Sequence, residues 1–144
     1  MKDQTIIVET TVDADVKTVW SALTNPEKMK AWYFVVNNFE LKHGNEFYFY
    51  EPGGTNFKHV CKILEIIPEE RLRHTWSYPE LSKGISVLNW QLRPHGKKTK
   101  LKLKHSGIEN LADGGSDFSR ENFIAGWEEI LKKNLKDFLF WEKG

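Results

Sequence analysis

The longest amphipathic segment of the chain reads DFSRENFIAGWEEILKKNLKDFLFW and runs from Asp117 to Trp141. Its apolar residues recur at steps of three and four, which is the period of an α-helix with one buried face. They are Phe123, Trp127, Ile130, Leu131, Leu135, Phe138 and Leu139. On the other face, Glu128 stands four residues before Lys132, the favourable order for a helical ion pair. The pattern predicts one long helix that needs an apolar surface to pack against.

The composition is that of a globular protein with one core. The chain has 144 residues, 40% of them hydrophobic and 28% charged, which suits a single domain over residues 1–144. Its net charge of +1 gives no electrostatic reason to expect nucleic acid or an anionic membrane as a partner. A single cysteine, Cys61, rules out an internal disulfide, and the N-terminus lacks the apolar core of a signal peptide. We therefore expect a cytoplasmic protein.

Most of the remaining chain alternates like β-strands. Strands are predicted at 4–12, 46–51, 57–67, 70–78, 84–93 and 97–106, with a shorter strand before Lys42. Turn sequences such as Pro52-Gly53-Gly54 separate them. Two short helices are expected after the first strand, one with an apolar stripe over 16–23 and one that begins at Asn25-Pro26. Successive strands with short connections predict an antiparallel meander.

Centring each turn gives the register of the hairpins. Trp90 is expected opposite Leu101, Leu72 opposite Trp90, and Ile63 opposite His74. One face of the sheet then carries Cys61, Ile63, Leu72, His74, Trp76, Leu88, Trp90, Leu101 and Leu103. The other face of the last strand carries alternating lysines over 98–104, which predicts a solvated face that also discourages edge pairing. For strand 46–51 the inward set is either the two phenylalanines or the two tyrosines.

Several local motifs follow one another in a fixed order. They are VWSALTNPE at 19–27, Trp32, Gly44 with Phe47 and Phe49, EIIP at 65–68, Arg71-Leu72, Trp76, residues 99–103 with His105 and Gly107, and Gly126-Trp127 with Leu131. This set is similar to the family related to the C-terminal domain of the activator of the Hsp90 ATPase, within the START/Bet v 1-like (SRPBCC) superfamily. The usual proline before the first helix is replaced by Val12-Asp13-Ala14-Asp15, where an aspartate cap serves the same purpose. The resemblance implies an α+β helix-grip fold, with six to seven antiparallel strands curved around the C-terminal helix.

The resemblance implies three kinds of function: binding of a hydrophobic small molecule, contact with an Hsp90-type chaperone, or a cyclase or hydrolase activity. We expect the first, with a cavity between the C-terminal helix and the sheet, and we expect no catalytic residue and no cofactor. The candidate cavity-lining residues are Trp32, Phe47, Phe49, Cys61, His74, Trp76, Leu88, Trp90, Leu103, Phe123, Trp127, Ile130 and Leu131. Such rings and aliphatic groups can also serve only to fill a core.

Individual residues suggest further hypotheses. Gly126 lies inside a helix, where glycine is unfavourable, so a close approach beside Trp127 is expected. His74 and Cys61 could form an acid/base pair, although a buried cysteine is more often a small apolar residue. The five histidines lack metal-ligand spacing, so no metal site is expected.

Two segments suggest motion or association. The stretch 106–116 is glycine-rich and is the natural candidate for a mobile flap. Phe140 or Trp141 falls outside the helical stripe, either as a dimer contact or as a frayed end. A monomer or a weak homodimer is therefore expected.

Overall fold

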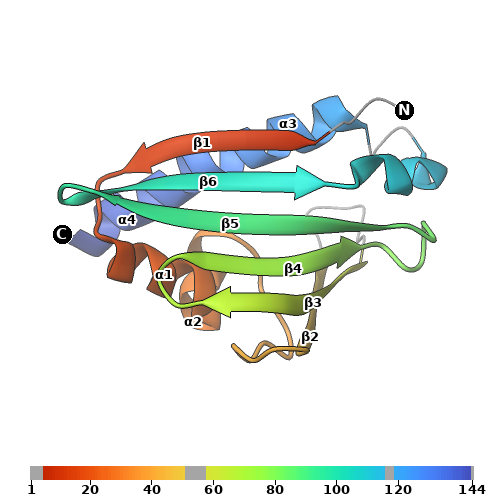
Figure 1. The fold of residues 1–144 in the computed structure, drawn as a ribbon, viewed down its shortest axis with the longest axis horizontal. Coiled ribbons are helices and arrows are strands. Elements are labelled where there is room, and N and C mark those ends of the chain that lie inside the picture. Colours follow the sequence, from red (N-terminus) through yellow and green to blue (C-terminus); the bar gives the residue numbers. More distant parts are fainter. Residues whose placement is uncertain (1–4, 51–57, 116–118, 144) are drawn as a thin grey trace.

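The computed structural model describes residues 5–50, 58–115 and 119–143. Its strands form one antiparallel sheet in the order β1-β6-β5-β4-β3-β2, so that the first and last strands of the chain are neighbours (Figure 1). The strands are β1 (Ile6–Val12), β2 (Glu46–Tyr50), β3 (Lys58–Ile67), β4 (Arg71–Ser77), β5 (Ile85–His95) and β6 (Lys98–Ser106). The predicted α+β class and the meander are confirmed.

Side-chain caps begin the helices. Asp15 accepts a hydrogen bond from the N–H of Thr18 and begins α1 (Val16–Thr24), and Asn25 begins α2 (Pro26–Trp32) in the same way. Ser119 caps the C-terminal helix, which consists of α3 (Arg120–Glu129), the π-helical segment η3 (Ile130–Asn134) and α4 (Leu135–Lys143). This helix lies across one face of the sheet (Figure 1). The predicted start at Asp117 lies outside the described residues.

The π-helical turn explains how one helix buries a stripe with a constant step. The buried residues along the whole C-terminal helix stand four apart in the sequence: Phe123, Trp127, Leu131, Leu135 and Leu139. An α-helix has about 3.6 residues per turn, so a step of four drifts by roughly 40° each time. The wider η3 turn, in which the N–H of Leu135 reaches the carbonyl of Ile130, holds more residues per turn and rotates the stripe back toward the sheet. The prediction of a uniform α-helix is corrected at this point.

The predicted inward face of the sheet is confirmed, because every residue assigned to it is buried. The pairs Leu72–Trp90 and Ile63–His74 also agree with the predicted register. The β5–β6 hairpin differs, since Trp90 lies opposite Leu103 and not Leu101. Pro94 and His95 extend β5, and the turn falls at Gly96 and Lys97, with Gly96 at a φ of +63° that favours glycine. A shift of two residues leaves the inward and outward faces unchanged.

Strand β2 turns Phe47 and Phe49 inward, which decides the alternative that the sequence left open. The short strand expected before Lys42 is absent from the described residues; only an isolated bridge between Asn37 and Tyr48 occurs there. The predicted turn at residues 52–54, together with residues 51 and 57 of the predicted strands, lies outside the described residues.

The stretch after β6 is not loose over the part that is described. It forms the 3₁₀-helix η1 (Ile108–Gly114), which buries Ile108 and Leu111. Asp113 accepts hydrogen bonds from the Ser82 hydroxyl and from the N–H of Lys83 at 3.0 Å. These bonds tie η1 to the β4–β5 loop, which contradicts the expectation of a flap for residues 108–114.

Candidate functional site

The candidate cavity residues come together between the C-terminal helix and the sheet. All of them are buried except Ile130, which is half-buried on the flank of the helix. They come from α2, from strands β2 to β6 and from the C-terminal helix. Their rings are in contact: the Trp127 ring centroid lies 5.2 Å from that of Trp76 and 5.9 Å from that of Trp90. The indole of Trp127 is thus the central contact between helix and sheet.

Trp127 fixes the state of a buried histidine. Its indole N–H donates to Nδ1 of His105 at 3.2 Å. An indole nitrogen can only donate, so Nδ1 is unprotonated and Nε2–H faces the Ser86 hydroxyl at 2.7 Å. Ser86 in turn donates to the carbonyl of Trp76 at 3.0 Å. Burial, with a smaller contribution from His74, lowers the pKa of His105 to about 3, so the ring is neutral.

His74 is held in the same manner by a second tryptophan. The indole of Trp90 donates to Nε2 of His74 at 3.2 Å, which leaves Nδ1–H to bind the carbonyl of Thr75 at 2.8 Å. Burial lowers the pKa of His74 to about 4, and burial raises the pKa of the Cys61 thiol well above its usual value. Both ring nitrogens of His74 are therefore occupied and the thiolate of Cys61 is disfavoured. This arrangement does not favour an acid/base pair.

A compact group of rings lies at the β2–β3 side of the interior. The imidazole of His59 stacks on Phe49 with 4.5 Å between centroids, and Phe34 stacks on the same phenylalanine at 4.5 Å. The Tyr78 hydroxyl accepts a hydrogen bond from the indole of Trp76 at 2.9 Å. The group therefore combines flat apolar surfaces with a few placed polar atoms, as small-molecule sites commonly do.

Two of the buried histidines in the interior, His74 and His105, are neutral because burial lowers the pKa of each. The buried polar side chains of the interior are His59, His74, Ser82, Ser86, Thr99 and His105. Burial raises the pKa of Tyr33 well above its usual value, with smaller contributions from Cys61 and Tyr78, so its phenol is neutral as well. A cationic ligand would find no carboxylate among these buried side chains.

Gly126 does not provide a close approach. A methyl group built on it would meet no atom within 4 Å, and the residue lies on the exposed side of α3. The expectation that Gly126 allows Trp127 to approach the sheet is therefore wrong, because Trp127 is buried whereas Gly126 is exposed with open space around it.

The described residues also bear on metal binding and membranes. No group of three or more His, Cys, Asp or Glu side chains in the described part of the chain could hold a metal ion. No helix among residues 5–50, 58–115 and 119–143 is long and apolar enough to cross a membrane.

Several residues of the interior were not predicted. His105 continues the series of every second residue that begins with Leu101 and Leu103. The alternation of β6 could therefore have identified its side chain as pointing inward. His59 stands two residues before Cys61 and could have been found in the same way. Tyr33 and Phe34 follow α2 in a segment without a periodic pattern, and no sequence signal points to their burial.

Comparisons with known proteins identify the same fold and a matching family. A family model described as "Activator of Hsp90 ATPase homolog 1-like protein" matches residues 13–139. Protein MLL2253 from Mesorhizobium loti has 23% identity and a TM-score of 0.77, over 94% of this chain and 96% of that one. CalU16 from Micromonospora echinospora has 28% identity and a TM-score of 0.71, over 95% of this chain and 74% of that one.

DynU16, a protein in the dynemicin biosynthetic locus, has 21% identity and a TM-score of 0.77, over 96% of this chain and 48% of that one. The present chain thus spans about half of DynU16. A comparison with curated proteins found no match. The solved structures confirm the predicted helix-grip fold, and the family model confirms the predicted resemblance.

Proposed function

We propose a function from the premise that the chain belongs to the family of Activator of Hsp90 ATPase homolog 1-like proteins, whose model matches residues 13–139. The protein binds an uncharged, apolar small molecule between the C-terminal helix and the sheet. The observation that carries this proposal is the interior itself, in which rings predominate and His74 and His105 are neutral. An uncharged ligand enters such surroundings without losing the hydration of an ionic group.

The position of the ring group supports the same function. Tyr33 and Phe34 are partly buried and pack against the core, and the Tyr33 ring lies 5.8 Å from that of Phe49 and 6.0 Å from that of Trp90. These side chains offer flat contact surfaces, and the phenol groups of Tyr33 and Tyr78 could fix the orientation of a ligand. A further support is that DynU16 belongs to a biosynthetic locus, a setting in which small molecules are handled.

Titration with the neutral fluorescent probe N-phenyl-1-naphthylamine tests this function. We expect a saturable rise in emission at one probe per chain. Cys61→Met adds volume at a fully buried position of the interior and should weaken probe binding about tenfold or more, because a filled interior leaves less room for a ligand. Circular dichroism would establish that the variant is folded.

Phe140→Ala is the matched control, because it removes an apolar ring that is 69% exposed and does not line a pocket with the candidate site residues. Its probe affinity should equal that of the unchanged protein. The proposal fails if the unchanged protein shows no saturable emission. It also fails if Phe140→Ala abolishes the signal while Cys61→Met keeps it, since the probe would then bind on the surface.

A second candidate function is contact with an Hsp90-type chaperone, which the description of the family model favours. Titrating the ¹⁵N-labelled chain with a purified Hsp90 tests it. Shifted or broadened amide signals confined to one surface would support this contact. Unchanged spectra at a saturating chaperone concentration would exclude it.

A further inference from the structure

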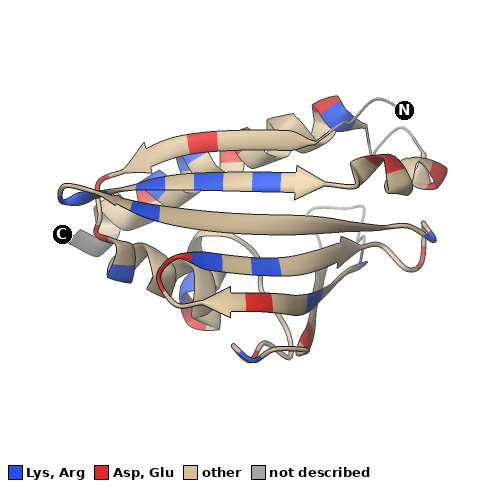
Figure 2. Ribbon diagram, viewed as in Figure 1, with Lys and Arg blue, Asp and Glu red and all other residues tan. Residues whose placement is uncertain are grey.

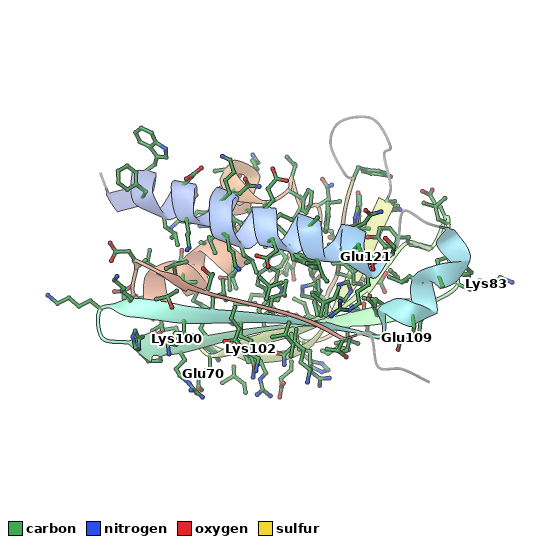
Figure 3. The ribbon with its side chains drawn as sticks, turned by 90° about the horizontal axis from the view of Figure 1, so that it is seen from above. Glu70, Lys83, Lys100, Lys102, Glu109 and Glu121 are labelled. Carbon is green, nitrogen blue, oxygen red and sulfur yellow. The ribbon has the colours of Figure 1, made fainter. Side chains whose placement is uncertain are left out.

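We propose that the outer face of the sheet, which is the face away from the C-terminal helix, binds a small anion with two or more phosphate-type groups. A hollow of about 450 Å³ lies on this face. Its cations come from three adjacent strands: Arg71 from β4, Arg93 from β5, and Lys100 and Lys102 from β6. Figure 3 shows the labelled Lys100 and Lys102 on the side of the sheet away from the helix. This site is separate from the interior and does not depend on the function proposed for it.

The strand register brings these cations together. Arg93 and Lys100 are direct partners across β5 and β6. In the next outward row, Gln91 lies between Lys102 on β6 and Arg71 on β4. Neighbouring strands are about 4.8 Å apart, so the four cations occupy an area roughly 10 Å wide. One ligand with several anionic oxygens can reach them together.

The cross-strand partners compensate this repulsion only in part, because Glu9 lies opposite Lys102 but Arg93 and Lys100 lie opposite each other. Like charges directly opposite each other on neighbouring strands are destabilising. Within the described part of the chain, Arg93, Lys100 and Lys102 form no salt bridge, and Arg71 is paired with Glu65, which is not part of the hollow. The lysines do not protect a sheet edge either, because β6 lies between β1 and β5. A bound anion would offset the repulsion and stabilise the folded state.

The other lining residues limit the kind of anion. Glu9 on β1 and Glu70 in the β3–β4 turn flank the cations on opposite sides, as the charges in Figure 2 indicate for β1 and for the turn before β4. The four cations of the lining face two lining carboxylates, and Glu65 pairs with Arg71, so an excess of one positive charge remains. The flanking carboxylates favour a compact anion over a long polyanion. The two guanidinium groups match the paired oxygens of a phosphate.

Titration of the ¹⁵N-labelled full chain with sodium pyrophosphate at low ionic strength tests the proposal. We expect saturable amide shifts in β4, β5 and β6 around the hollow, and binding that weakens as salt is added. Arg93→Gln and Lys100→Gln should each weaken binding about tenfold, since each removes a charge-assisted hydrogen bond. Each also removes a like-charge contact, so both variants should fold at least as stably as the unchanged protein.

Lys104→Gln is the matched control, because Lys104 lies exposed on the same strand and face but outside the hollow. It should change the affinity by less than about twofold. A parallel titration with ADP identifies the source of the phosphate: tighter binding than pyrophosphate indicates an organic phosphate that also uses Ile67 and Pro94. Equal binding indicates that only the phosphates are recognised. The absence of saturable shifts with either compound, or an equal loss in Lys104→Gln, would overturn the proposal.

Discussion

On β6, Leu101 and Leu103 face the C-terminal helix and are buried, whereas Lys100 and Lys102 alternate with them on the outer face. The same strand therefore belongs to two different environments. On the inner face, the polar atoms of His74, Ser86 and His105 have hydrogen-bond partners, as in the bond from Trp127 to His105. On the outer face, several cations have no carboxylate partner among the described residues. The inner face should therefore dominate the stability of the fold, whereas the cations of the outer face should contribute little to stability and remain available to an anion.

Replacing Trp127 should have the largest effect on the inner face. Trp127→Ala removes a ring that is 3% exposed and leaves Nδ1 of His105 without its donor. We expect a loss of about 3–5 kcal/mol in the free energy of unfolding, measured by urea titration. Trp141→Ala removes an equal ring from an exposed position and should change stability by less than about 0.5 kcal/mol. If both variants lost a similar amount of unfolding free energy, the burial of Trp127 would not explain its contribution to stability.

Acid should destabilise the inner face through its two histidines. Their folded pKa values, about 4 for His74 and about 3 for His105, lie below the ordinary value of 6.5. Below pH 6.5 the unfolded chain therefore takes up protons that the folded chain does not bind. The stabilisation is complete above pH 6.5 and is lost as the pH falls toward the folded pKa values. Each ring should account for about 2 kcal/mol of the loss by pH 5.

Urea unfolding at several pH values between 7 and 5 measures this effect. His105→Gln also lowers the absolute stability, so the informative quantity is the slope of the free energy of unfolding against pH. This slope measures the protons taken up on unfolding, and the variant should take up about one proton fewer. His74→Gln should reduce the slope in the same way. If both single variants keep the full slope, the two histidines do not cause the acid sensitivity.

The alternation of apolar and polar residues made most of this sheet predictable. Leu72, His74 and Trp76 were assigned to the inner face from turn positions alone, and they are buried. The error of two residues at the β5–β6 turn did no harm, because side chains alternate with a period of two. The face of the sheet on which a residue lies can therefore be predicted more reliably than its exact cross-strand partner.

The site was less predictable, because its details depend on contacts between distant segments. The pairing of Trp127 with His105 joins α3 to β6, and spacing along the chain contains no information about it. The group formed by Tyr33 and Phe34 depends on where α2 ends against the sheet. The basic hollow was also missed, since a net charge of +1 conceals a local excess of cations on one face.

Gly126 tests whether the helix, like the sheet, is packed on only one side. Gly126→Ala adds a methyl group in open space within a helix and should raise the free energy of unfolding by about 0.5–1 kcal/mol. Gly84→Ala is the contrasting variant, because its methyl group would lie 1.8 Å from the carbonyl oxygen of Asn110 and should destabilise the protein. Chemical denaturation of both variants measures the difference. A destabilising Gly126→Ala would mean that the outer side of α3 also has a packing partner.

The smallest change in stability is expected on the outer face, at Glu65. Its carboxylate lies 3.3 Å from Nη1 of Arg71 and 3.6 Å from Nε of Arg73, beside the bulge in β3, and all three side chains are partly exposed. Because water screens such pairs, Glu65→Gln should cost less than about 1 kcal/mol, and the difference should shrink further in added salt. The same substitution frees Arg71 and should tighten pyrophosphate binding in the neighbouring hollow. A cost comparable to that of Trp127→Ala, with unchanged pyrophosphate affinity, would mean that the outer charges maintain the fold and do not serve a ligand.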